Sequence, residues 1–139
     1  MDQRILVPFD SSKLGTLALD RALAGHSEAE ITVIHVIDPR QSTYTIEGGL
    51  SGSVQQARES VAKRMIAEAE QHADEHDTTI TTVVEEGAAG DAIIEYVKEN
   101  EIDHVIMGSH DQSKISRVFV GHTAEVVIHN SPVPVTIVR

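Results

Sequence analysis

The sequence contains no cysteine, so disulfide bonds, zinc sites built from thiolates and catalysis by a thiol are excluded. It contains no tryptophan, and its aromatic residues are Phe9, Tyr44, Tyr96 and Phe119. A surface on which successive nucleic-acid bases stack needs more rings than these. Neither thiol chemistry nor base stacking is therefore expected.

Basic residues are scarce as well. Lysine and arginine together number 11 against 22 aspartates and glutamates, which gives a formal net charge of −11. This balance argues against binding the phosphate backbone of DNA or RNA, and mildly against anionic membrane surfaces. An acidic surface is typical of proteins that work at high intracellular salt, and it equally serves ordinary solubility. The composition leaves both readings open.

Long apolar runs are missing too. No stretch of the 139 residues approaches the length that spans a bilayer, and the first residues lack the charged-then-apolar pattern of a signal peptide. We therefore expect a cytoplasmic protein. No linker, repeat or composition shift divides the chain, so we expect one domain over residues 1–139.

Short apolar segments alternate with helical patterns along the chain. The segments with the composition of buried strands are residues 5–9, 31–37, 80–84, 105–107 and 135–138. Between them, apolar residues recur every three or four positions. This β-α-β-α-β-α-β-α-β alternation predicts an α/β fold with a parallel sheet covered by helices on both faces. The alternation in residues 80–84 places that strand at an edge.

Several residues predict where these elements begin, end and face the core. Asp10, Ser11 and Ser12 are helix-capping types, Pro8 belongs at the end of its strand, and Gly25 is a stop. Residues 87–91 are expected to form a turn, and a long helix is expected to begin at Ser53. The predicted inward positions of the first and last helices are Leu14, Leu17, Ala18, Ala22, Leu23, Ala124, Val127 and Ile128.

Two glycines mark a candidate anion site near the C-terminus. Gly108 ends an apolar strand, a polar loop follows, and Gly121 precedes a short helix. Unpaired N–H groups and the helix dipole favour negative charge at such a helix start. The spacing matches neither the dinucleotide fingerprint nor the P-loop.

This stretch resembles the universal stress protein family, whose nucleotide-binding members carry Gly-x-x-Gly, nine further residues, then Gly-Ser or Gly-Thr. Gly108 and Gly121 match this motif, whereas Asp111 and His122 replace its second glycine and its hydroxyl residue. The likeness extends over almost the whole chain, including residues 5–10 and 35–38. It implies a single-domain, doubly wound, Rossmann-like sheet of the adenine nucleotide alpha hydrolase type with strand order 3-2-1-4-5. Ligands then bind between the loops after strands 1 and 4.

The resemblance also implies which residues touch a nucleotide. The residue matching Val36 holds adenine through its backbone, the one matching Asp10 lies by the ribose, and the glycine loop surrounds the phosphates. The candidate nucleotide-binding residues are Pro8, Phe9, Asp10, Val36, Met107, Gly108, His110, Gly121, His122 and Thr123. Asp10 is alternatively a plain helix cap, and the side chain of Val36 is alternatively sheet core. The implied ligand is ATP or another adenine nucleotide, with Mg²⁺ as a possible companion.

The two departures from the motif have several chemical readings. The carboxylate of Asp111 could repel the phosphates, turn to solvent, or hold Mg²⁺ shared with phosphate oxygens. The imidazole of His122 still offers one N–H, and Thr123 could cap the same helix. His72 and His76 share a helix face and suit a metal pair, although a solvated polar face is the favoured reading. His35 is expected to be a satisfied core or sheet-end histidine.

No catalytic arrangement stands out, and no catalytic or metal-binding residue is assigned. The first hypothesis is a nucleotide-binding domain of the universal stress type acting in stress response, with affinity weakened by Asp111 and His122. The second is a dimeric interaction module that no longer binds nucleotide. The third is a weak ATP hydrolase. We also expect a homodimer formed through the last strand and a mobile loop at residues 40–52.

Overall fold

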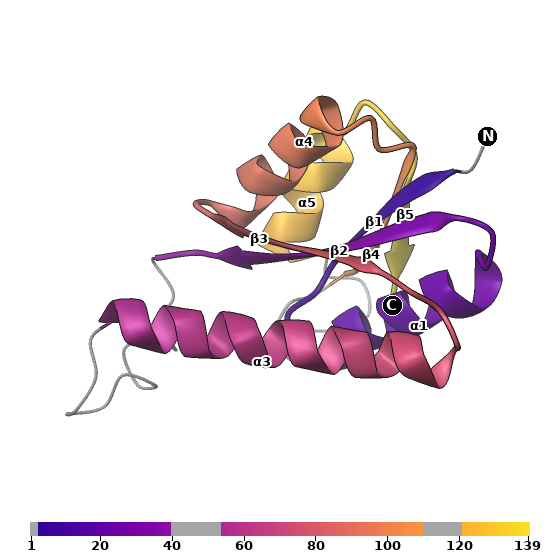
Figure 1. Ribbon diagram of the computed structural model, residues 1–139. Helices are drawn as coiled ribbons and strands as arrows, with labels where there is room; N and C mark the ends of the chain where they lie inside the picture. Colours follow the sequence, from indigo (N-terminus) through magenta and orange to yellow (C-terminus); the bar gives the residue numbers. More distant parts are fainter. Residues whose placement is uncertain (1–2, 40–53, 110–120) are drawn as a thin grey trace.

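The computed structural model describes residues 3–39, 54–109 and 121–139 (Figure 1). Strands and helices alternate in the predicted order. The strands are β1 (Arg4–Pro8), β2 (Glu30–Ile37), β3 (Thr81–Glu86), β4 (His104–Gly108) and β5 (Val135–Val138). The helices are α1 (Lys13–Gly25), α3 (Val54–Glu75), α4 (Ala89–Glu99) and α5 (His122–Asn130).

The strands form one parallel sheet in the order β3-β2-β1-β4-β5, which confirms the implied topology. Helices α1 and α3 lie on one face and α4 and α5 on the other, as Figure 1 shows with the sheet seen almost edge-on. The chain covers one face while it builds β1 to β3, and the other face from β3 to β5. The reversal of direction beside β1 and β4 makes their carboxyl ends the switch point of the sheet.

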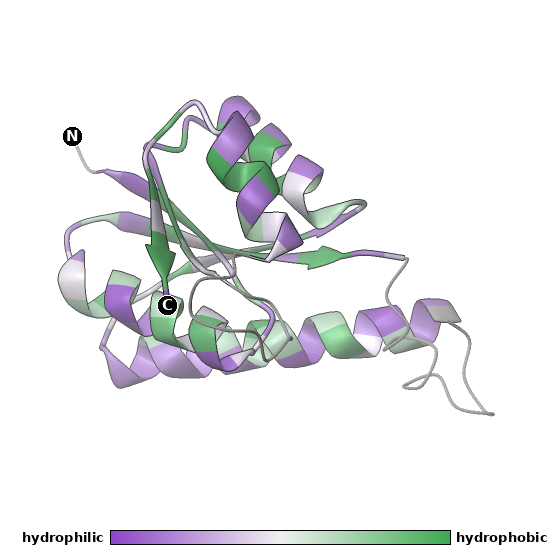
Figure 2. Ribbon diagram, turned by 180° about the vertical axis from the view of Figure 1, so that it is seen from behind, coloured by the Kyte–Doolittle hydropathy of each residue, from purple (hydrophilic) through white to green (hydrophobic). Residues whose placement is uncertain are grey.

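Each face of the sheet covers its own apolar cluster. The cluster under α1 and α3 includes Ile5, Val7, Phe9, Val33 and Ile106. The cluster under α4 and α5 is built from the alternate strand residues and includes Leu6, Ile34, Val105 and Met107. Hydropathy colouring in Figure 2 shows apolar residues on the strands and on the helix surfaces that face them. Burial on both faces explains why the middles of β1 and β4 are continuously apolar and why β2 is mostly so.

Two of the predicted inward positions are wrong. Leu17 on α1 and Ile128 on α5 are 37% and 44% exposed, whereas Ala18, Ala22, Ala124 and Val127 are buried. The spacing of apolar residues predicts a wider buried face on each helix than the neighbouring elements cover. The predicted turn at residues 87–91 is also too long, because α4 already begins at Ala89. The predicted edge position of the third strand is confirmed.

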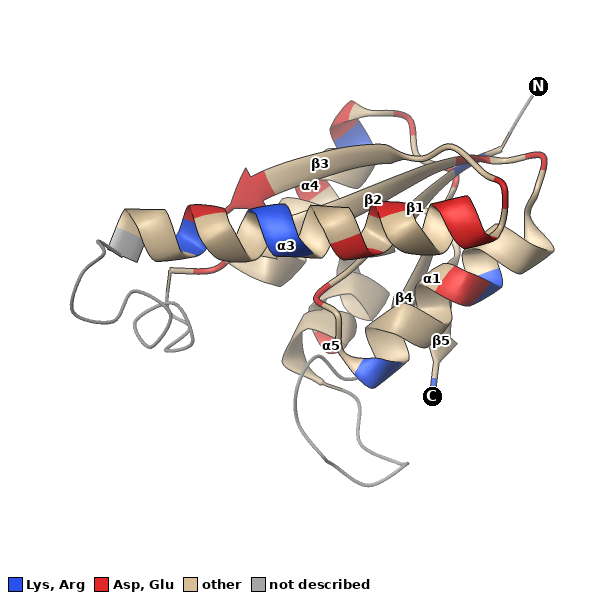
Figure 3. Ribbon diagram, turned by 60° about the horizontal axis from the view of Figure 1, so that its bottom comes forward, with Lys and Arg blue, Asp and Glu red and all other residues tan. Residues whose placement is uncertain are grey.

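The long helix α3 is described from Val54 onward, so the predicted start at Ser53 lies outside the described residues, as does the loop at 40–52. Acidic residues gather on the C-terminal half of α3 (Figure 3). Within the described residues, no helix combines the length and the apolar character that crossing a membrane demands.

Candidate functional site

The loop between β1 and α1 holds a carboxylate over the first turn of α1. The backbone N–H of Ser12 donates to Oδ1 of Asp10 over 3.0 Å, and the N–H of Gly15 donates to Oγ of Ser12 over 3.1 Å. Ser12 is therefore the N-cap residue, and Asp10 closes a turn in front of it. Ser11 between them has a φ of 60°, in the left-handed region that few non-glycine residues adopt.

Gly15 makes room for the Asp10 side chain, a role that the sequence pattern did not reveal. A Cβ atom at Gly15 would lie 2.9 Å from Oδ1 of Asp10 and 3.0 Å from Oγ of Ser12. The carboxylate can fold back over α1 because this position has no side chain. Since Asp10 already supplies negative charge at the start of α1, this helix end is poorly suited to receive a phosphate.

Gly108 packs directly against the same helix turn. A Cβ atom there would lie 2.8 Å from the carbonyl carbon and 2.9 Å from Cβ of Leu14, and 3.0 Å from the backbone nitrogen of Gly15. Backbone atoms cannot move aside as a flexible side chain can. The glycine at the end of β4 therefore has a packing reason, in addition to the phosphate-binding reason that the motif implies.

The start of α5 is the open helix N-terminus beside the switch point. Its N-cap is Gly121, and no side chain makes a capping hydrogen bond there. The N–H of Gly121 donates to the carbonyl of Ser109 over 2.6 Å, and the N–H of Ser109 donates to the carbonyl of Val138 over 2.8 Å. These bonds tie the helix start to the ends of β4 and β5. Among the residues that the structure describes, no side chain caps the first-turn N–H groups of α5, which is the arrangement that suits an anion.

The predicted capping role of Thr123 is wrong, because Gly121 is the cap and Thr123 lies inside the helix, half-buried. His122 is exposed at the first helical position. His110 and Asp111 lie outside the described residues. The side chains of Phe9 and Met107 belong to the two apolar clusters on opposite faces of the sheet, and only their backbone atoms border the switch point.

The end of β2 is joined to the Asp10 turn. The N–H of Phe9 donates to the carbonyl of Ile34 over 2.9 Å, and Nδ1 of His35 lies 3.2 Å from the carbonyl oxygen of Phe9. His35 is 5% exposed, and its Nε2 has no hydrogen-bond partner among the described residues. The prediction of a fully satisfied histidine is thus wrong at Nε2. The side chain of Val36 packs on the α4/α5 cluster, as the core reading of that residue predicted.

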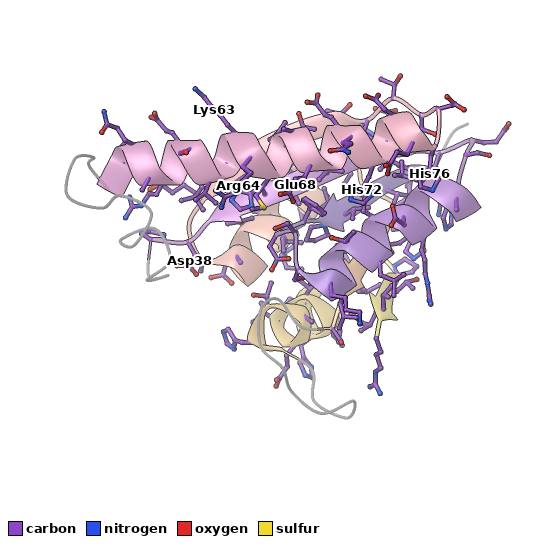
Figure 4. All side chains as sticks on the ribbon, turned by 90° about the horizontal axis from the view of Figure 1, so that it is seen from below. Asp38, Lys63, Arg64, Glu68, His72 and His76 are labelled. Atoms are coloured by element: carbon purple, nitrogen blue, oxygen red, sulfur yellow. The ribbon has the colours of Figure 1, made fainter. Side chains whose placement is uncertain are left out.

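His72 and His76 do not form the solvated face that the sequence favoured. Nδ1 of His72 lies 3.0 Å from Oδ1 of Asp20, so the ring bridges α3 to α1 (Figure 4). Nδ1 of His76 bonds the carbonyl of His72 over 3.0 Å, and the His72 ring meets Phe9 edge-on at 6.5 Å between centroids. In residues 3–39, 54–109 and 121–139 no three acidic or histidine side chains converge as metal ligands.

A hollow lies away from the switch point, between the end of β3 and α4. Its volume is about 430 Å³, and its lining includes Glu85, Glu86, Asp91, Glu95 and Glu99. Five carboxylates around one hollow would repel a phosphate. The switch point, with its open helix start, is therefore the candidate site for an anionic ligand.

Comparison with known proteins shows which family the chain belongs to. The family model described as the universal stress protein family matches residues 1–139. The chain belongs to this family. A curated relative, universal stress protein YxiE of Bacillus subtilis, is 28% identical over 151 residues and covers 100% of both chains. The stress response protein NhaX of the same organism is 29% identical over 162 residues, covering 98% of this chain and 97% of its own.

Solved structures of the family share the fold. Universal stress protein UspA from Lactobacillus plantarum superposes with a TM-score of 0.80 at 24% identity, covering 99% of this chain and 97% of its own. A universal stress protein in complex with cAMP gives 0.72 at 24% identity, with 99% and 97% coverage. The Arabidopsis thaliana family protein with AMP bound gives 0.70 at 12% identity, with 98% and 90% coverage.

Proposed function

We propose that this protein binds an adenine nucleotide at the switch point between β1 and β4 and acts in a stress response. The observation that carries the proposal is the open N-terminus of α5 beside a glycine that packs against α1. There, unpaired N–H groups and the helix dipole suit a phosphate. The AMP and cAMP complexes of other family members support the choice of ligand.

In this proposal the backbone of Val36 receives the adenine and Asp10 lies near the ribose. The phosphates approach Gly108, Gly121, His122 and Thr123, with His110 in the same loop. The bond from the Ser12 N–H to Oδ1 holds the Asp10 carboxylate in this turn, beside the proposed ribose position. Met107, Pro8 and Phe9 contribute backbone atoms.

The altered motif positions define the affinity we propose. His122 is exposed at the start of α5, where a protonated imidazole would attract phosphate. Asp111 brings a negative charge to a position where relatives with the full motif have bare backbone, so binding is weaker than in those relatives. A Mg²⁺ ion shared between Asp111 and the phosphates would reverse that effect.

Calorimetric titration of the protein with AMP and ATP, with and without Mg²⁺, tests the proposal. Binding in the micromolar to millimolar range that is reduced at least about tenfold by His122→Glu would support it, because a second carboxylate at the helix start repels phosphate. Glu125→Gln in the same first turn makes the opposite change of charge, so it should leave binding unchanged or slightly strengthen it. Absence of binding to every adenine nucleotide would reject the proposal.

We propose binding rather than catalysis as the role of this site. The polar groups that the described residues bring to the switch point are a turn-forming carboxylate, a capping hydroxyl and backbone N–H groups, which hold and orient a ligand. Weak ATP hydrolysis is the alternative. Steady phosphate release from ATP that is lost with the His122→Glu variant would favour it.

The second candidate function is that of a dimeric interaction module, and the β5 edge favours it. Val133, Val135 and Ile137 are partly buried on the α4/α5 face of this edge strand, and Ile128 is 44% exposed nearby. We propose that β5 pairs with β5 of a second copy. Dimer formation and nucleotide binding are compatible. If the protein dimerises and binds no nucleotide, only the interaction-module function is supported.

A further inference from the structure

We propose that His35 is a positioning residue: while its ring is neutral, it holds the Phe9–Asp10 turn in the geometry that receives a ligand. The inference rests on the proposed nucleotide site, because it concerns the loop that would meet the ribose. It adds a residue that makes no proposed contact with the nucleotide and a dependence on pH.

The first step is the protonation of the ring. Nδ1 of His35 lies 3.2 Å from the carbonyl oxygen of Phe9, and a carbonyl oxygen only accepts hydrogen bonds. Nδ1 therefore bears the proton, and in the neutral ring Nε2 is a bare acceptor. No described residue bonds Nε2, although the side chain is 95% buried (5% exposed). A proton added to Nε2 would create both a buried charge and a donor without an acceptor.

The second step is the connection from the ring to the turn. The carbonyl of Phe9 belongs to the peptide unit that leads into Asp10, and the N–H of Phe9 is bonded to Ile34 on β2. The bond from His35 thus holds the carbonyl group of Phe9, while the bond to Ile34 holds its N–H group. Asp10 in turn orients Ser12, and Ser12 caps α1. Removing the bond from His35 frees a turn that already includes Ser11 at a φ of 60°.

The third step is the electrostatic surroundings. Burial lowers the pKa of His35, while the bond to Phe9 and the charge of Asp10 oppose that shift. Across Phe9, α3 presents His72, which is bonded to Asp20 of α1. Further along the same sheet face, Arg58 of α3 meets Glu86 of β3 over 3.7 Å. Burial is the largest effect, so the neutral ring is the form that the folded protein favours.

The consequence is a nucleotide affinity that falls on acidification. When the turn opens, the ring of His35 reaches water and the cost of burying its charge disappears. A protonated His35 therefore favours the open turn, which no longer presents Asp10 to a ligand.

Two amide variants separate the two ring nitrogens. His35→Asn places an N–H donor near the position of Nδ1 and does not titrate, whereas His35→Gln places it near the position of Nε2. We expect His35→Asn to match the AMP affinity of the wild type at about pH 8 and to bind AMP more tightly than the wild type at about pH 5.5. We expect His35→Gln and His35→Leu to bind AMP about five- to tenfold more weakly at both values, the effect of one buried hydrogen bond.

The control for general histidine effects is His104→Asn. His104 lies at the opposite ends of the strands, and its pKa is also lowered by burial and by His26. The phosphate of AMP titrates in the same way with every variant. The ratio of a variant's affinity to the wild-type affinity at the same pH therefore reports on the protein alone. A ratio of His35→Asn affinity to wild-type affinity that stays the same at both pH values, or a His104→Asn ratio that rises on acidification as the His35→Asn ratio should, would overturn the proposal.

A measurement without nucleotide distinguishes failure of this inference from failure of the proposed function. Nitrogen chemical shifts of the His35 ring should show a protonated Nδ1 and a bare Nε2 at neutral pH. Hydrogen exchange of the Ser12 amide, which is bonded to Asp10, should be slow in the wild type and in His35→Asn, and at least about tenfold faster in His35→Leu. Equal exchange in all three would reject the positioning role whether or not AMP binds.

Discussion

Asp111 is the residue whose chemistry most sharply tests the nucleotide proposal. If its carboxylate lies about 4 Å from a phosphate charge, the repulsion is roughly 4 kcal/mol at an effective dielectric constant of 20. Asp111→Gly should then strengthen ATP binding by up to that amount, and the gain should shrink with added salt. Calorimetry provides the measurement. A weakening of Mg-ATP binding in the same variant would instead identify Asp111 as a metal ligand.

Gly108 offers a prediction that needs no ligand. Gly108→Ala should lower the free energy of unfolding by about 1–3 kcal/mol, because the new methyl group meets backbone atoms of α1 rather than movable side chains. Gly25→Ala is the matched control: no atom lies within 4 Å of the added Cβ, so its helix-end position should be neutral or slightly stabilised. Urea unfolding of both variants measures the difference. Equal stabilities would contradict the packing role.

Among the secondary-structure elements, α5 and β5 together present the surface on which dimerisation depends. Val126 of α5 faces Gly90 of α4. Ile128 is two residues further on, about 200° around the helix, and so lies on the side away from α4. Since α5 packs on β5 and α4 on β2, that side borders the β5 edge.

We therefore expect Ile128→Glu to convert a dimer into a monomer without loss of stability. Val84→Glu on β3 is the matched control, because Val84 is 43% exposed at the opposite edge of the sheet. Light scattering at micromolar concentration is the measurement. A wild-type protein that is monomeric at working salt would reject dimerisation through β5.

For the protein as a whole, two histidines predict that stability decreases in acid. The pKa of His35 and that of His104 are both lowered from 6.5, mainly by burial. Below about pH 6.5 these histidines bind more protons in the unfolded chain than in the folded one. Their contribution to stability is therefore fully present above that pH, and it is lost as the pH falls through their lowered pKa values in the folded protein. His104 is only partly buried, so solvent screens its charge and it contributes less.

Urea unfolding between about pH 7.5 and 5 should show this decrease, and His35→Leu should flatten most of it. His104→Asn should flatten only a small part. A decrease of the same size in His35→Leu would place its origin in groups other than His35.

The sequence determined the class of fold because strand burial on both faces leaves a direct mark on composition. Residues 5–7 and 105–107 are apolar without alternation, as expected of strands in a sheet that is covered on both sides. The pattern then identified Gly108 and Gly121 as candidates, because Gly108 ends an apolar strand, Gly121 precedes a helix, and their separation matches the motif that the chain resembles. Strand order came from family resemblance rather than periodicity, because periodicity says which face a residue takes and not which strand lies beside it.

Only the tertiary structure decided what surrounds each candidate residue. The exposure of Leu17 and Ile128 depends on where neighbouring helices end, and no local pattern records that. The need for glycine at position 108 arises from contact between the end of β4 and the first turn of α1, segments that meet only after the chain has crossed the sheet. His35 likewise reads as an ordinary strand residue in the sequence. Its bond to Phe9 and its partnerless Nε2 exist because parallel pairing sets β2 beside β1 in one register.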